Sequence, residues 1–147
     1  DELARRYPNQ VFAHIGFDEG LAHRIEASAD FFLMPSRFEP CGLNQMYSQR
    51  YGTIPVVHGV GGLKDTVDPW RISSKGFIRG EGTGFAFQGL SREKLLHVLQ
   101  FAARTRRFRP FWDQIRKNAM ELDFSWDAVL PEYEKLYQKA LLGPVSS

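Results

Sequence analysis

Cysteine, net charge and long apolar runs are all scarce in this sequence, and each scarcity excludes a class of protein. The chain has one cysteine in 147 residues, so it cannot form an internal disulfide and is not a disulfide-stabilised secreted scaffold. A formal net charge of +2 is too small to indicate a nucleic-acid or membrane partner. No apolar run approaches the length that spans a bilayer. Hydrophobic residues make up 43% of the chain, which predicts an ordered domain with its own core.

Short apolar segments alternate with helical patterns through the first half of the chain. We predict strands at Val11–Phe17, Asp30–Pro35 and Thr53–His58, with helices after Asp18 and after Gly42 between them. The strands are continuously apolar rather than alternating, which is typical of a parallel sheet covered by helices. The sequence therefore predicts an α/β fold.

The second half of the chain is predicted to be mostly helical. A long polar, glycine-rich loop is expected at Asp68–Thr83, followed by an edge strand at Gly84–Phe87. Three helices are expected to begin after Ser91, Pro110 and Ser125. The chain starts without methionine, with DELARRYPNQ, which is typical of a helix end and a turn. We therefore expect a piece of a longer protein, cut inside a domain.

A carboxylate and a glycine turn stand directly before one predicted helix, in the stretch PSRFEPCGLNQMYSQRYG. Unpaired backbone N–H groups collect at a helix N-terminus and favour negative ligands. We expect the N–H groups of Gly42, Leu43 and Asn44 to hold a phosphate, with Glu39 facing sugar hydroxyls or a developing positive charge. A second glycine turn, Gly59–Gly62, also follows a strand, so both turns are expected at one rim of the sheet, where ligands bind.

The same stretch, continued as PSRFEPCGLNQMYSQRYGTIPVVHGVGGLKDTV, closely resembles the donor-site segment of bacterial glycogen synthases and plant starch synthases, glycosyltransferase family 5. IGFDEGLAHRIEASAD and GTGFAF also resemble that family, so the resemblance covers nearly the whole chain. It implies part of the C-terminal domain of a GT-B enzyme, whose two Rossmann-like domains enclose the active site. Residues 1–125 would be a Rossmann-like nucleotide-sugar-binding domain lacking its N-terminal part, and residues 126–147 a helix crossing to the missing N-terminal domain.

The resemblance implies a retaining glucosyltransferase that moves glucose from ADP-glucose to the non-reducing end of an α-1,4-glucan. Glu39 would contact the transferred glucose and be needed for transfer, and Phe17 would stack on adenine. The remaining donor-site residues implied are Cys41, Gly42, Leu43, Asn44, Gly61 and Gly62. ADP-glucose is a substrate rather than a cofactor, and no metal site is expected because the four histidines lack ligand spacing.

Each of these residues also has a purely structural interpretation. Glu39 can be a helix-entry carboxylate favoured by the helix dipole. Phe17 can pack in the core at a strand end, and the glycines at 61 and 62 can serve a turn with positive φ. Cys41 is expected to be a small buried thiol whose backbone alone takes part in function.

Two departures from related transferases bear on activity. Many retaining GT-B transferases carry a second glutamate eight positions after the first, where this chain has Tyr47. Family 5 shows the same replacement, and we expect Tyr47 and Tyr51 to be core residues. The acceptor-side motif K-x-G-G-L and the basic residues that neutralise the diphosphate are absent, so we expect the chain alone to bind the donor weakly at best and to be inactive.

Two other functions stay open on the sequence. One is a GT-B transferase that uses a different sugar nucleotide, and the other is a truncated, non-catalytic module that binds nucleotide or glucan. A location in the cytoplasm is expected if the source is bacterial, and in the plastid if it is a plant.

Overall fold

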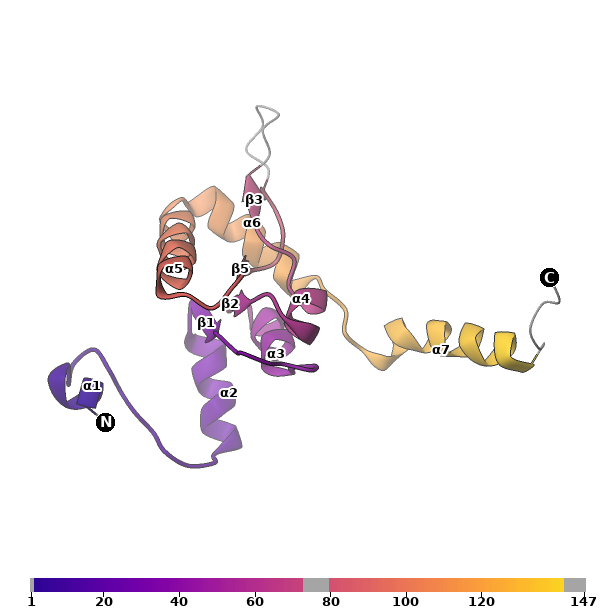
Figure 1. Cartoon of the computed structure of the whole chain (residues 1–147), viewed down its shortest axis with the longest axis horizontal. Coiled ribbons are helices and arrows are strands. Elements are labelled where there is room, and N and C mark those ends of the chain that lie inside the picture. Colours follow the sequence, from indigo (N-terminus) through magenta and orange to yellow (C-terminus); the bar gives the residue numbers. More distant parts are fainter. Residues whose placement is uncertain (1, 73–79, 142–147) are drawn as a thin grey trace.

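The computed structural model describes residues 2–72 and 80–141 of the chain (Figure 1). A three-stranded parallel sheet lies at its centre, in the order β1-β2-β5. Its strands are β1 (Phe31–Met34), β2 (Ile54–His58) and β5 (Phe85–Phe87). The predicted parallel sheet with flanking helices is therefore confirmed, and β5 is an edge strand as expected.

Helices connect and cover these strands or lie, at the two ends of the described chain, away from the sheet. They are α1 (Glu2–Arg6), α2 (Glu19–Ser28), α3 (Asn44–Tyr51), α4 (Gly61–Thr66), α5 (Arg92–Arg107), α6 (Arg109–Met120) and α7 (Trp126–Leu141). The predicted caps of α2 and α5 are confirmed: the Asp18 carboxylate accepts from the Leu21 N–H at 2.8 Å, and the Ser91 hydroxyl from the Lys94 N–H at 3.2 Å. None of the helices in the described ranges is long and apolar enough to cross a membrane.

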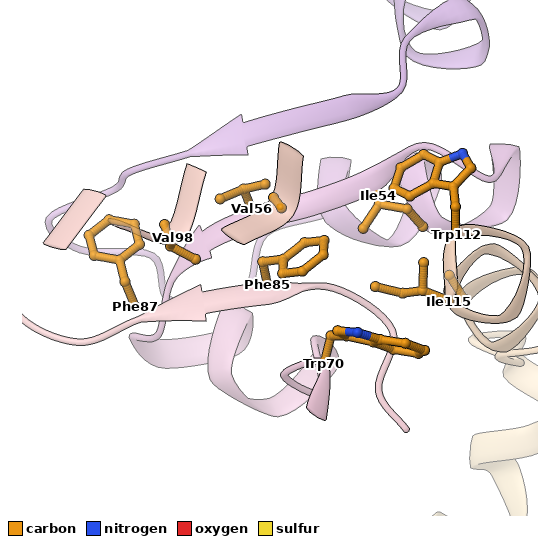
Figure 2. Close-up of a cluster of buried hydrophobic side chains, with 10 residues drawn as sticks. Ile54, Val56, Trp70, Phe85, Phe87, Val98, Trp112 and Ile115 are labelled. Carbon is orange, nitrogen blue, oxygen red and sulfur yellow. The ribbon is translucent and has the colours of Figure 1, made fainter. Parts of the chain in front are cut away.

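The main core lies between one face of the sheet and helices α5 and α6. Because side chains alternate along a strand, Ile54 and Val56 of β2 point to this face, where they meet Ile115 of α6. Figure 2 shows Phe85 in the middle of the cluster, with Phe87 and Val98 toward one end and Trp112 and Ile115 toward the other. This packing anchors the carboxyl ends of the strands, which carry the candidate site.

The opposite face of the sheet is covered more thinly. Val57 packs there with Leu63 of α4 and with Val67, all of them at most 1% exposed. The buried Thr53 hydroxyl, just before β2, contacts the carbonyls of Glu26 and Ala29 at the end of α2. These contacts tie α2 to the sheet, and the single hydroxyl proton satisfies one of the carbonyls that the helix end leaves free.

The predicted loop Asp68–Thr83 contains a short antiparallel pair in its described part. β3 (Arg71–Ile72) pairs with β4 (Gly80–Glu81), and residues 73–79 lie outside the described residues. The Asn118 side-chain amide of α6 donates to the Gly82 carbonyl at 3.0 Å, which holds the base of this pair against α6. The loop is therefore partly structured where it meets the core.

The predicted strand at Val11–Phe17 is wrong. This segment forms no strand, and Phe12, Ile15 and Phe17 are 81%, 84% and 97% exposed. A strand is stable only with a neighbour that accepts its hydrogen bonds and covers its apolar face. Within the part of the chain that the structure describes, nothing pairs with it, although its apolar composition is that of a strand.

The division at residue 125 stays a prediction. Helix α7 runs away from the sheet and its covering helices (Figure 1), and none of its residues from Trp126 to Leu141 is buried. Its side chains nonetheless include an apolar stripe, with Trp126 76%, Leu136 63% and Leu141 87% exposed.

Candidate functional site at the rim of the parallel sheet

The two glycine turns lie against each other at the carboxyl ends of β1 and β2, as predicted. The Gly62 N–H lies 3.1 Å from the Glu39 carbonyl and 3.2 Å from the Pro40 carbonyl. A Cβ atom on Gly61, whose φ is +47°, would lie 1.9 Å from the Glu39 carbonyl oxygen. A Cβ on Gly62 would lie 2.0 Å from the Cys41 carbonyl oxygen. These two positions have room for glycine alone, because the backbones of the two turns touch.

The first turn is also held from the side of α3. The side-chain amide of Gln45 donates to the carbonyls of Cys41 at 3.1 Å and Gly42 at 3.0 Å, and lies 3.0 Å from the Thr66 hydroxyl on α4. Gly42 has a φ of +70°, and a Cβ there would lie 2.4 Å from the Gln45 Oε1 atom. Gln45 is completely buried and was not among the predicted site residues, although it stands inside the resembling motif.

The start of α3 offers backbone donors to a ligand. Among the described residues, no side chain caps this helix: the residue at its N-cap, Leu43, makes no side-chain cap hydrogen bond. The first backbone N–H groups bonded to the Leu43 carbonyl are those of Met46 and Tyr47, one turn into the helix. An uncapped helix start beside a glycine turn is suited to an anion such as a phosphate.

Glu39, whose backbone carbonyl joins the two turns, is a partly buried residue. The Ser36 hydroxyl lies 3.3 Å from Glu39 Oε2, and the Ser36 carbonyl lies 2.8 Å from Nδ1 of His58. His58, at the end of β2, is 6% exposed, and its ring centroid lies 5.3 Å from that of Phe87. His58 was not among the predicted site residues. The signal in the sequence is a polar residue that ends an apolar strand.

The structure corrects the interpretation of Cys41 and Phe17. The Cys41 thiol is exposed, so the prediction of a buried thiol is wrong; it is the Cys41 carbonyl that is engaged, by Gln45. The Phe17 side chain is 97% exposed, so packing in the core is also wrong for this chain. The structure does not bring Phe17 against the two turns, and its role at adenine stays a prediction.

Helix α3 buries its polar face rather than its apolar one. Its buried residues are Gln45, Ser48 and Gln49, whereas Tyr47 and Tyr51 are 43% and 41% exposed, so their prediction as core residues is wrong. The polar face is satisfied only in part. Gln49 donates to the Thr66 carbonyl at 3.2 Å and the Ser48 hydroxyl to the Gln45 carbonyl at 3.0 Å, whereas the buried Oε1 atoms of Gln45 and Gln49 have no hydrogen-bond partner among the described residues.

The outward face of α3 lines an open groove of about 850 Å³. The other wall is the connection from α6 to α7, and the lining includes Met46, Arg50, Phe124 and Trp126. His23 of α2 lies beside α3, with its Nδ1 atom 3.2 Å from the Tyr51 hydroxyl.

Across residues 2–72 and 80–141, no three His, Cys, Asp or Glu side chains gather as a metal site would require.

Comparison with known proteins finds similarity along almost the whole chain, although no family model matches it. The glycogen synthase of Nitrosospira multiformis is 52% identical over 139 residues, 95% of this chain and 28% of that protein. The glycogen synthase of Anaeromyxobacter sp. (strain Fw109-5) is 54% identical over 141 residues, 96% of this chain. The glycogen synthase of Koribacter versatilis is 44% identical over 138 residues, 94% of this chain. The chain therefore spans about 28% of the length of the curated relatives it matches.

Solved structures of other proteins share the fold of this chain. The catalytic domain of starch synthase IV from Arabidopsis thaliana, bound to ADP and acarbose, has a TM-score of 0.71 and 31% identity over 93% of this chain and 28% of that chain. Sucrose-phosphate synthase from Thermosynechococcus elongatus has a TM-score of 0.61 over 96% of this chain; at 21% identity it supports the fold alone. Both similarities fit the α/β, GT-B-type fold expected from the sequence.

Proposed function

We propose that this chain, a homologue of a segment of bacterial glycogen synthases, is the donor-binding part of a retaining glucosyltransferase. The whole enzyme transfers glucose from ADP-glucose to the non-reducing end of an α-1,4-glucan. Identities of 52%, 54% and 44% to three glycogen synthases support this proposal. The structural observation that carries it is the meeting of Glu39, both glycine turns and the uncapped start of α3 at one rim of the sheet.

The first part of the proposed chemistry is electrostatic. The backbone N–H groups at Gly42, Leu43 and Asn44 point at the diphosphate of the donor and stabilise the charge that grows on it as the glycosidic bond breaks. These donors are fixed before the substrate arrives, because Gln45 and Gly62 hold the turn from both sides. Donors that are already oriented need no reorganisation as charge develops, so no free energy is spent on it during the reaction.

The second part concerns the sugar. Breaking the bond to diphosphate leaves a glucosyl group of oxocarbenium character, and a nearby carboxylate stabilises it. We assign this role to the carboxylate of Glu39, the residue whose backbone carbonyl accepts from Gly62 where the two turns meet. Gly61 and Gly62 line the cleft, the Cys41 backbone belongs to the donor turn, and Phe17 stacks on adenine. The proposal includes neither a metal nor a cofactor.

The proposal also assigns a partner to α7. Its exposed apolar stripe packs on the rest of the enzyme, in particular on an N-terminal domain that completes the cleft. The acceptor glucan and the groups that neutralise the diphosphate then belong largely to that other part. The isolated chain is therefore inactive in transfer, and the whole enzyme works in the cytoplasm if it is bacterial.

Calorimetric titration with ADP and UDP tests the donor site. The wild-type chain should bind ADP in preference to UDP, and Gly42→Val should weaken binding at least about tenfold, because a side chain at φ +70° must displace Gln45. Gly20→Ala, where a Cβ meets its nearest neighbour at an ordinary 3.6 Å, is the matched control and should bind like the wild type.

Two results would redirect the proposal. Preference for UDP would favour a transferase with another sugar nucleotide. If the longer protein that contains this sequence lacks transfer from ADP-glucose while its donor site still binds nucleotide, a non-catalytic nucleotide-binding module is favoured. Glu39→Ala separates chemistry from binding, since it should abolish transfer in the longer enzyme and leave ADP affinity close to the wild-type value.

A further inference from the structure

The loop that carries Glu39 is fixed at separate points by separate residues. At its far end, Gln45 and Gly62 hold the carbonyls from Glu39 to Gly42. At its near end, the Ser36 carbonyl is held by His58 alone among the described side chains, at 2.8 Å. The near end can therefore be released while the diphosphate-binding turn keeps its own contacts.

The geometry of His58 defines which ring atom does the holding. A backbone carbonyl only accepts hydrogen bonds, so the Nδ1 atom facing Ser36 carries a proton and donates it. The ring cannot move easily, since it is 6% exposed and its centroid lies 5.3 Å from that of Phe87 on the neighbouring strand. Strand β2 thus holds the Nδ1–H group of His58 in a fixed orientation toward the Ser36 carbonyl.

Ser36 passes this constraint to Glu39. The residue whose carbonyl His58 holds also places its hydroxyl 3.3 Å from Glu39 Oε2. Fixing the Ser36 backbone restricts where its hydroxyl points, and hence which orientation of the carboxylate is favoured.

We propose that His58 is a positioning residue for Glu39, acting through Ser36. This inference rests on the proposed function, because it gives Glu39 its role at the sugar. It predicts that loss of the His58 donor misorients the carboxylate in the transition state. Donor binding is kept, because Gln45 and Gly62 hold the diphosphate turn independently.

Steady-state kinetics of the longer synthase that contains this sequence tests the inference. His58→Phe keeps an aromatic ring beside Phe87 but removes the donor, and should lower kcat about 10- to 100-fold with KM for ADP-glucose nearly unchanged. His58→Asn places an amide N–H at the position of Nδ1 and should recover most of the lost kcat. His97→Phe, on the exposed face of α5, is the matched control and should leave kcat unchanged.

A double-mutant cycle separates positioning from general loosening of the fold. If His58 acts through Ser36, then His58→Phe combined with Ser36→Ala lowers kcat no further than the more damaging single change. Additive losses, a rise in KM without loss of kcat, or no rescue by His58→Asn in a folded variant would each overturn the inference. The wild-type measurement keeps the two proposals apart, because a synthase that fails to use ADP-glucose contradicts the proposed function itself.

Discussion

Strand β2 and helix α7 are both rich in apolar residues, yet one is completely buried and the other is not buried at all. All five residues of β2 are buried, whereas every residue of α7 from Trp126 to Leu141 stays accessible in the described structure. The difference does not lie in their composition, since the apolar stripe of α7 consists of Trp126, Leu130, Tyr133, Leu136, Tyr137 and Leu141. An apolar pattern shows that an element has a face to bury. It does not show whether the surface that buries it belongs to the same stretch of chain.

The segment Val11–Phe17 belongs with α7 in this comparison. It was predicted as a strand from its apolar residues, and it remains exposed because the described chain offers it no neighbour. Both segments lie outside the body formed by the sheet, α5 and α6 (Figure 1). Substituting the same residue type inside this body and outside it therefore compares how much buried and exposed apolar residues contribute to the stability of the chain.

The largest effect is expected for Phe85→Ala in the centre of the core. Phe85 is 1% exposed and packs edge-on against Phe31 and Phe101, with centroids 6.3 Å and 5.6 Å away. Its truncation should lower the free energy of unfolding by about 3–5 kcal/mol, measured by urea denaturation. Phe17→Ala is the matched control, and a change above about 0.5 kcal/mol there would show that the exposed segment packs in solution.

The next effect is expected for Gly61→Ala at the candidate site. The new Cβ would lie 1.9 Å from the Glu39 carbonyl oxygen on a backbone with φ +47°, so the two turns must separate. We expect a loss of roughly 1–3 kcal/mol in stability and a parallel loss of ADP affinity. Stability is read from urea denaturation and affinity from calorimetry. An unchanged ADP affinity in Gly61→Ala would mean that contact between the turns is not needed for the donor site.

A smaller, pH-dependent effect is expected at Glu26 on α2. Glu26 is 5% exposed and its Oε2 atom has no hydrogen-bond partner in the described structure. Burial raises the pKa of Glu26, although His23 partly opposes the shift. A carboxyl with a raised pKa stabilises the fold most when protonated, so stability falls as the pH rises from its ordinary pKa to the raised one.

Glu26→Gln should therefore stabilise the protein at neutral pH, and the gain should vanish below roughly pH 4. Thermal unfolding across this pH range measures it. Glu93 at the start of α5 provides a contrast of opposite sign, because its own backbone N–H and the Ser91 hydroxyl lower the pKa of Glu93. Glu93→Gln should lose stability at neutral pH and match the wild type in acid. If both variants changed the stability at neutral pH in the same direction, the opposite pKa shifts assigned to Glu26 and Glu93 would be contradicted.

The smallest effect is expected for Leu136→Ala on α7. Leu136 is 63% exposed, so the free energy of unfolding of this chain should change by less than about 0.5 kcal/mol. In the longer synthase, where we propose that α7 packs on another domain, the same change should cost about 2–4 kcal/mol. Equal and negligible effects in both proteins would contradict the proposed partner of α7.

Much of the local structure was predictable from the sequence. The helices after Asp18 and Ser91 begin where the cap residues indicated, because capping depends on atoms within one turn of the chain. The helix predicted after Ser125 begins at Trp126. The central strands were predictable since a continuous apolar run is costly to expose. The meeting of the two glycine turns also followed, because parallel strands bring the loops at their carboxyl ends to one rim.

The tertiary structure alone decided the rest. Helix α3 buries Gln45 and Gln49 and exposes Tyr47 and Tyr51, which reverses the usual preference. It does so because α4 supplies the Thr66 carbonyl to which Gln49 donates and the Thr66 hydroxyl that lies 3.0 Å from the Gln45 amide nitrogen. The contact of His58 with Ser36 joins residues 22 positions apart on different strand ends. Local pattern determines where an element begins and which face is apolar; which face is buried depends on partners that only the assembled fold brings near.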